Sequence, residues 1–178
     1  NCLALENGDP CNSCTICLSS NSNTLLDTIE LDAASNRGID EIRDIRDKVN
    51  FAATEGKYKI YIIDEAHMLT DQASNAFLKT LEEPPSHVIF ILCTTESHRI
   101  LPTILSRCQR HDFRRIQNAD MINQLSSIAS KESFSIDNEA LKTISRQSFG
   151  SLRDAENLLE QIVISYGNNI TNDHVADM

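Results

Sequence analysis

Lys59-Ile-Tyr-Ile-Ile-Asp-Glu-Ala-His67 is the stretch from which the fold of this chain is inferred. Four consecutive residues that favour β-strands, Ile60 to Ile63, run directly into two acids, Asp64 and Glu65. An unbroken apolar run is typical of a strand that is covered on both faces, as in a parallel sheet flanked by helices. Ligands of such sheets bind at the carboxyl ends of the strands. We therefore expect the two acids to meet a ligand rather than a core.

The acidic pair suits the hydrolysis of a magnesium-bound nucleotide. Mg²⁺ is commonly held by one or two carboxylates together with substrate phosphates, so Asp64 would hold the metal, directly or through water. Glu65, one residue further on, would polarise the attacking water. The alternative is that an acidic pair only ends a strand and caps the next turn. The pattern alone leaves both interpretations open.

Length and composition set the outer bounds. The chain has 178 residues and 40% hydrophobic content, enough for one domain or two small ones. It has no apolar run long enough to span a bilayer and no signal-peptide pattern, so we expect a soluble, cytoplasmic protein. A net charge of −10 argues against a free-standing DNA-binding module, because phosphate contacts supply most non-specific affinity. The absence of a starting Met predicts a segment of a longer protein.

Four of the six cysteines lie close together near the start of the chain, with the spacing C-x8-C-x2-C-x2-C. In a cytoplasmic chain, such a cluster indicates metal binding or catalysis before disulfides. Tetrahedral Zn²⁺ held by four thiolates would tether a loop that has little apolar surface to bury, and would be structural because no coordination position stays open. An iron-sulfur cluster and a pair of disulfides are the alternatives. The predicted zinc ligands, in a module over residues 1–20, are Cys2, Cys11, Cys14 and Cys17.

Strands and helices alternate through the middle of the chain. A strand is predicted over Asp27 to Asp32, and a helix follows whose apolar face consists of Ile39, Ile42, Ile45 and Val49. Another helix begins after Thr70 and ends before Pro84. A second buried strand, Val88 to Cys93, should end beside Asp64, because a helical crossover favours parallel neighbours. Thr95 would then orient water or sense a terminal phosphate; hydrogen bonding at the strand end is the alternative.

Two arginines are candidates for phosphate contacts. Arg107 follows a short helical stretch, and a guanidinium there could stabilise the charge of a transferring phosphoryl group; a surface ion pair is the alternative. Arg153 lies in the first turn of a predicted helix, where a cation opposes the helix dipole by about 0.3 to 1 kcal/mol. An anion nearby would offset this cost. A nucleotide phosphate is one candidate, and Asp154 or Glu156 is the other.

From about residue 116 onward the alternation stops. Three apolar stripes at helical spacing predict a small bundle of about three helices, with a fourth short helix after Thr171.

Taken together, these segments resemble the gamma/tau subunits of the bacterial DNA polymerase III clamp loader. The resemblance covers essentially the whole chain and depends on the order and joint occurrence of several motifs: Ile62-Ile-Asp-Glu-Ala-His-Met-Leu69, Leu78-Lys-Thr-Leu-Glu-Glu-Pro-Pro85, Thr94-Thr95, Leu105-Ser-Arg-Cys108 and Gly150-Ser-Leu-Arg-Asp-Ala155, with the cysteine pattern before them. It implies an α/β AAA+ ATPase with a parallel sheet of the P-loop NTPase type. Residues 1–116 would be part of the nucleotide-binding core, including the zinc module, and residues 117–178 would be a three-helix lid domain.

The resemblance also implies a role for each site residue. Asp64 and Glu65 would be the Walker B acids, Thr95 the sensor 1 residue, and Arg107 an arginine finger that acts on a neighbouring subunit. Arg153 would be the sensor 2 arginine of the lid. The implied function is that of the ATPase motor that loads the sliding clamp onto primed DNA, with ATP and Mg²⁺ bound and with the clamp, the primed DNA and other clamp-loader subunits as partners.

One departure from the family pattern matters. The phosphate-binding loop G-x-x-x-x-G-K-[ST] is absent, because Gly56-Lys57 lacks the earlier glycine and is followed by Tyr58. We expect this loop to lie upstream of Asn1, so that the segment alone is inactive, binds ATP weakly or not at all, and does not bind DNA tightly. Two alternatives remain: a scaffold subunit of the same machine that does not hydrolyse ATP, and a zinc-containing adaptor with a degenerate nucleotide fold.

Overall fold

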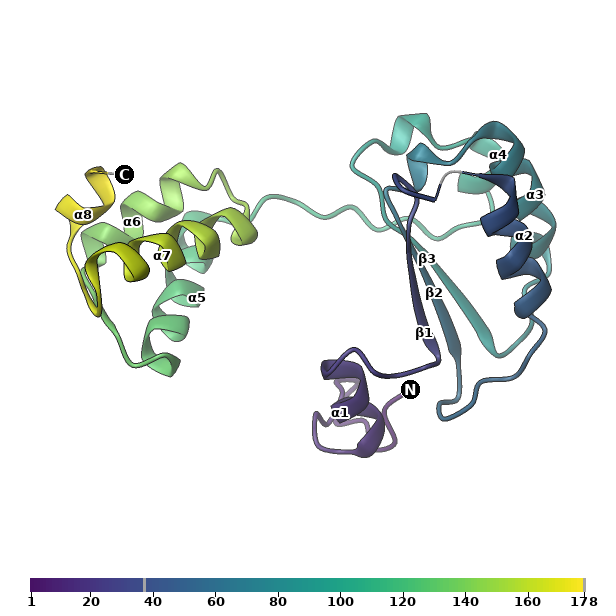
Figure 1. The fold of residues 1–178 in the computed structure, drawn as a ribbon, viewed down its shortest axis with the longest axis horizontal. Coiled ribbons are helices and arrows are strands. Elements are labelled where there is room, and N and C mark those ends of the chain that lie inside the picture. Colours follow the sequence, from purple (N-terminus) through teal and green to yellow (C-terminus); the bar gives the residue numbers. More distant parts are fainter. Residues whose placement is uncertain (37, 178) are drawn as a thin grey trace. The chain divides into compact units, whose positions relative to one another are not determined.

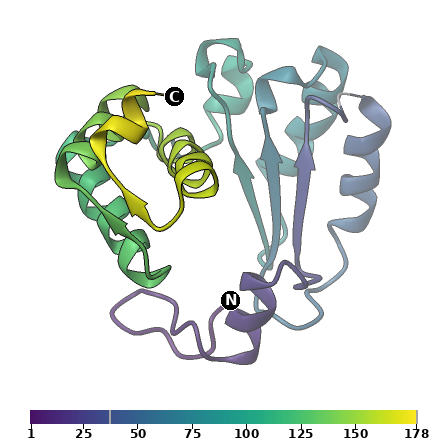
Figure 2. The same ribbon diagram turned by 60° about the vertical axis from the view of Figure 1, so that its left-hand side comes forward.

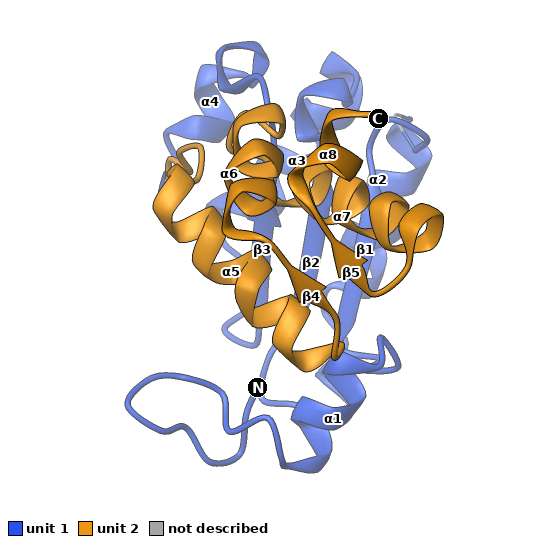
Figure 3. Cartoon of the chain, turned by 90° about the vertical axis from the view of Figure 1, so that its left-hand side faces the viewer, with its two compact units in different colours: residues 1–110 blue, residues 111–178 orange. Residues whose placement is uncertain are grey.

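The computed structural model describes residues 1–36 and 38–177, which form two compact units, residues 1–110 and residues 111–178 (Figures 1 and 3). Each unit has a hydrophobic core of its own. The assignment of residues 1–116 to the nucleotide-binding core and of residues 117–178 to the lid stays a prediction. Within the described residues, none of the helices combines the length and apolar character that crossing a membrane requires.

Three parallel strands form the sheet of the first unit, as predicted. They are β1 (Thr28–Asp32), β2 (Lys59–Asp64) and β3 (Val88–Leu92), in the order β1-β2-β3. Figure 2 shows them side by side, pointing the same way. Asp32 pairs with Asp64, and Ile63 pairs with Leu92, so the three strands end at one edge of the sheet. This register brings the polar residues that follow β2 and β3 to the same edge.

Helices cover one face of this sheet. They are α2 (Ile39–Lys48), α3 (Asp71–Glu82) and the short α4 (Pro102–Leu105), with single 3-10 turns η1 (Ala66–Met68) and η2 (Ser97–Arg99) at the strand ends. Thr70 caps α3 as predicted, its hydroxyl accepting a hydrogen bond from Ala73 N at 3.2 Å. Phe77 of α3 is 1% exposed and meets Phe90 edge to face, with ring centroids 4.9 Å apart. Burial of one such ring contributes about 1.5 to 3 kcal/mol.

The prediction that the apolar strands are covered on both faces is wrong for β3, which lies at the edge of the sheet. Alternate residues of β2, Tyr61 and Ile63, are 2% and 0% exposed and face the helices, whereas Ile89 and Ile91 of β3 are 40% and 43% exposed. The physical reason is that α2, α3 and α4 all lie on one side of the sheet (Figure 1). An unbroken apolar run shows that both faces are apolar, but it does not show what covers each face.

The cysteine-containing loop precedes β1 and carries the helix α1 (Thr15–Asn21). Asn1 ties this loop to the segment between α2 and β2, because its side-chain amide donates to Tyr58 O and accepts from Tyr58 N, both at 2.8 Å. Asp27, directly before β1, holds the same segment and is 1% exposed. Its carboxylate accepts hydrogen bonds at 2.7 Å from three consecutive backbone amides, those of Thr54, Glu55 and Gly56.

The second unit is mainly helical, as predicted. Over the part of the chain that the structure describes, its helices are α5 (Asn118–Lys131), α6 (Asn138–Gln147), α7 (Leu152–Tyr166) and the short α8 (Asn172–Ala176). The prediction of a purely helical unit is wrong in one respect: two short parallel strands, β4 (Ser135–Ile136) and β5 (Asn169–Ile170), pair beside the helices. Two-residue strands have too few residues to show a period in the sequence.

Candidate functional site

Asp64 and Glu65 lie where β2 leaves the sheet. Asp64 is exposed, and its Oδ1 accepts a hydrogen bond from Glu65 N at 2.9 Å. Glu65 has the left-handed conformation φ 47°, ψ 43°, which few residues other than glycine adopt. Such a conformation costs about 1 to 3 kcal/mol and often marks an active site. The strain at Glu65 therefore supports a functional role for its side chain.

Thr95 lies beside Glu65, as expected from parallel strands that end at one edge. Its hydroxyl donates a hydrogen bond to Glu65 Oε2 at 3.3 Å, across two segments that are 30 residues apart in sequence. The structure thus brings together two of the predicted site residues, one after β2 and one after β3. A carboxylate beside a hydroxyl at an exposed strand end can hold and orient a water molecule.

His67 is a third member of this group, and sequence reasoning assigned it no role. Its side chain is 6% exposed, and Nδ1 lies 2.9 Å from Thr94 Oγ1 and 3.2 Å from Glu65 Oε2. Its Nε2 lies 3.5 Å from Glu96 Oε1. The position of His67, two residues after Glu65, could have suggested it as a site residue. The sequence does not show the turn that directs the ring back toward Glu65.

Arg107 is placed apart from these contacts. Its guanidinium forms an ion pair with Glu82 at the end of α3, and donates a hydrogen bond to Thr103 O at 2.6 Å. The side chain is 30% exposed. Within residues 1–36 and 38–177 its side-chain partners are Glu82, Thr103 and Ser106, none of which contacts Glu65. A role for Arg107 at a nucleotide therefore requires that it acts elsewhere, and that role stays a prediction.

Arg153 belongs to the second unit and lies in the first turn of α7. The Ser151 hydroxyl caps this helix by accepting a hydrogen bond from Asp154 N at 3.3 Å. Arg153 is exposed, and within residues 1–36 and 38–177 it forms no ion pair with Asp154 or Glu156. Its predicted contact with a nucleotide phosphate stays a prediction.

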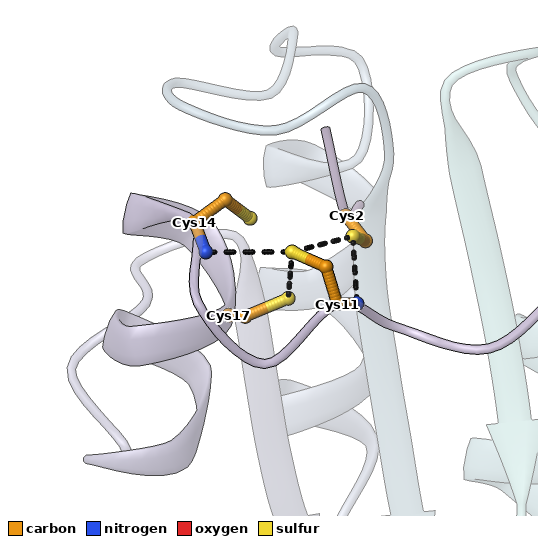
Figure 4. Close-up of side chains that lie close together, drawn as sticks. All are labelled: Cys2, Cys11, Cys14 and Cys17. Atoms are coloured by element: carbon orange, nitrogen blue, oxygen red, sulfur yellow. Dashed lines mark hydrogen bonds between the residues drawn. The ribbon is translucent and has the colours of Figure 1, made fainter. Parts of the chain in front are cut away.

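The four clustered cysteines converge, as Figure 4 shows. Their sulfur atoms all lie within 4.8 Å of one another; Cys2 and Cys11 Sγ are 3.5 Å apart, and Cys11 and Cys17 Sγ are 4.0 Å apart. A tetrahedral zinc site with Zn–S bonds of about 2.3 Å separates its sulfurs by about 3.8 Å. The arrangement therefore fits a tetrahedral metal ion. All six cysteines are free, which disfavours the alternative of two disulfides.

The surroundings of the cysteines affect their ionisation in opposite directions: they lower the pKa of Cys11 and Cys14 and raise that of Cys17. Backbone amides donate to the sulfurs: Cys11 N to Cys2 Sγ at 3.3 Å and Cys14 N to Cys11 Sγ at 3.4 Å. Hydrogen bonds from Ser13 and then from Cys14 lower the pKa of Cys11 to about 6. Burial raises the pKa of Cys17 to about 12, so this thiol needs a cation to ionise at neutral pH.

Two family models together cover most of the chain. One, described as DNA polymerase III, delta subunit, matches residues 1–117, and the other, described as the ATPase lid domain of a DNA polymerase III clamp loader subunit, matches residues 120–169. The tau subunit of DNA polymerase III from Bacillus subtilis is 50% identical over 163 residues, which are 92% of this chain and 29% of that protein. The chain thus spans less than a third of this relative.

Solved structures agree on the fold. RuvB of Thermotoga maritima, a Holliday junction branch migration motor, matches with a TM-score of 0.70 at 16% identity, over 90% of this chain and 54% of that chain. A DNA polymerase III gamma subunit-related protein of Thermotoga maritima matches with a TM-score of 0.51 at 26% identity, over 83% of this chain and 55% of that chain. The α/β fold is therefore that of the AAA+ ATPases. By sequence and fold, the chain belongs to the family of bacterial DNA polymerase III clamp-loader subunits, in which its relatives are gamma and tau subunits.

Proposed function

We propose that this chain is part of the ATPase motor of the bacterial replicative clamp loader, which loads the sliding clamp onto primed DNA within the DNA polymerase III holoenzyme. The contact between Glu65 and Thr95 carries this proposal, because it joins a carboxylate and a hydroxyl from neighbouring strands at the edge where such sheets bind ligands. Residues 1–116 would belong to the nucleotide-binding core and residues 117–178 to the lid.

Each acid has a separate role in the proposed reaction. Asp64 is exposed at the strand end and would hold Mg²⁺, directly or through water. The ion, when bound, would neutralise the charge that develops on the phosphates. Glu65 would accept a hydrogen bond from the attacking water and align it with the terminal phosphate. Thr95 would hold the Glu65 carboxylate in place and sense that phosphate.

The two arginines would link hydrolysis to movement. Arg153 would contact the phosphates from the lid, and Arg107 would leave Glu82 to reach the nucleotide of a neighbouring subunit. Loss of the terminal phosphate would then weaken both charge contacts and release the clamp. The partners of the full-length protein would be other clamp-loader subunits, the clamp and primed DNA.

The four cysteines would hold a structural zinc ion. Four thiolates leave no coordination position open for a substrate, so the ion would stabilise the loop before β1 and take no part in hydrolysis. Metal analysis of protein purified without added zinc tests this role. We expect about one zinc ion for each chain, whereas a brown, iron-containing sample would contradict it.

The experiment that tests the proposed function replaces Glu65 by Gln in the full-length protein, assembled with its partner subunits. The amide keeps the size of the side chain but is a poor base, so we expect kcat for ATP to fall by about 100-fold or more. ATP affinity should stay within about twofold, because Glu65 would contact water rather than phosphate. Glu83→Gln, on an exposed residue at the end of α3, is the matched control. Unchanged ATP turnover in the Glu65→Gln protein would refute the proposal.

A further inference from the structure

His67 is held by groups on both sides of its ring. The 3-10 turn η1 (Ala66–Met68) directs the side chain into the space between the segments that follow β2 and β3, where it is 6% exposed. Nδ1 faces Thr94 Oγ1 at 2.9 Å and Glu65 Oε2 at 3.2 Å, while Nε2 faces Glu96 Oε1 at 3.5 Å. A ring fixed at both nitrogens has little freedom to rotate, which suits a residue that orients another side chain.

The position of the proton on the ring decides which carboxylate it contacts favourably. The hydrogen bond of Nδ1 is with Thr94 Oγ1 at 2.9 Å, and Glu65 Oε2 lies beside Nδ1 at 3.2 Å. A proton on Nδ1 therefore attracts that carboxylate, whereas a bare Nδ1 would set a lone pair against it. Thr94 Oγ1 already accepts a hydrogen bond from Glu96 N at 3.0 Å, and Glu96 also pairs with Arg99 at 3.2 Å. The charge of Glu96 is therefore shared with Arg99, whereas the side-chain donors that approach Glu65 among the described residues are Thr95 and His67.

These contacts fall on one oxygen of Glu65. Both the Thr95 hydroxyl and His67 Nδ1 approach Oε2. The other oxygen, Oε1, is thereby left to accept a hydrogen bond from water. On the basis of the proposed function, we propose that His67 is a positioning residue: its Nδ1 holds Oε2 of Glu65, so that Oε1 is aimed at the attacking water.

Two substitutions separate the nitrogens of His67. The amide nitrogen of Asn can take the place of Nδ1, and that of Gln can take the place of Nε2. In the full-length protein, assembled with its partner subunits, His67→Gln should lower kcat for ATP by about 10- to 100-fold, while ATP affinity stays within about twofold. His67→Asn should retain kcat within about threefold, because a donor still faces Glu65. His98→Gln, on an exposed residue that lies 3.7 Å from Glu96, is the matched control and should leave kcat unchanged.

The results that would overturn the proposal differ from those that would overturn the function. Equal loss of kcat in the Asn and Gln variants, in parallel with lower melting temperatures, would show that the ring only fills space. Unchanged kcat in both variants would show that Glu65 needs no second contact. If instead Glu65→Gln hydrolyses ATP at the normal rate, the proposed function itself fails, whatever the His67 variants do.

Discussion

Replacement of Asp27 by Asn should destabilise the first unit. The Asp27 carboxylate is 1% exposed and accepts three hydrogen bonds of 2.7 Å from the backbone amides of Thr54, Glu55 and Gly56. Burial raises the pKa of this carboxyl, but the three donors outweigh burial and hold the pKa below its usual range. The segment between α2 and β2 therefore depends on one buried charge.

The magnitude follows from counting donors. The side-chain oxygen of Asn can occupy only one of the two oxygen positions of the carboxylate, where it still accepts hydrogen bonds from backbone amides. The NH₂ group occupies the other position and there faces at least one backbone N–H. One buried donor without a partner costs about 1 to 3 kcal/mol, and the bonds that remain lose their charge assistance. We expect a loss of about 2 to 4 kcal/mol in the free energy of unfolding, out of a total of about 5 to 15 kcal/mol for a typical domain.

Urea unfolding followed by circular dichroism measures this loss, and hydrogen exchange of the Thr54, Glu55 and Gly56 amides localises it. Because the folded pKa of Asp27 is lowered, its stabilisation is complete above the unfolded pKa of about 3.9 and is lost as the pH falls through the folded value. The difference between wild type and Asp27→Asn should be constant above about pH 5 and shrink below about pH 4. Asp44→Asn, on an exposed residue of α2 that lies 3.9 Å from Lys48 Nζ, is the control. A difference under about 0.5 kcal/mol at pH 7 would refute the argument.

Three further predictions concern other parts of the chain. Cys17→Ser should abolish stoichiometric zinc and lower the melting temperature, as measured by metal analysis and calorimetry, because it removes one of four converging ligands. Gly150→Ala should destabilise the second unit by about 1 to 3 kcal/mol in urea unfolding. The reason is that the added Cβ would lie 2.8 Å from Arg115 Cβ and 2.9 Å from Ile116 O. The control Gly167→Ala, at the same φ of 81° but with open space around the added Cβ, should cost less. Arg107→Ala should slow ATP turnover in the assembled ring without weakening nucleotide binding to its own subunit, and a loss of that binding in titration calorimetry would contradict a role in trans.

Much of the first unit could be predicted from the sequence, because its signals are local. The apolar runs before Asp64 and Thr94 predicted β2 and β3, and the helix between them predicted a parallel crossover. Parallel strands end at the same edge, so Thr95 was expected beside the acids, and it contacts Glu65. The cysteine spacing likewise predicted a cluster, which the structure forms.

The remaining features depend on contacts between residues that are distant in sequence. No pattern around Asp27 shows that three amides, 27 to 29 residues later, will enclose it. The ion pair between Arg107 and Glu82 joins residues 25 positions apart, and no period in the sequence predicts it. His67 is aimed by the left-handed conformation of Glu65 and the turn that follows, and glutamate has no intrinsic preference that would predict this conformation.

The position of a bound triphosphate relative to Glu65 tests the central claim most directly. An experimental structure of the full-length protein with Mg²⁺ and a non-hydrolysable ATP analogue provides that measurement. We predict a Glu65 carboxylate oxygen at about 2.6 to 3.2 Å from the water that faces the terminal phosphate, with Asp64 bound to Mg²⁺ directly or through water. A triphosphate bound away from the carboxyl ends of β2 and β3 would contradict the account.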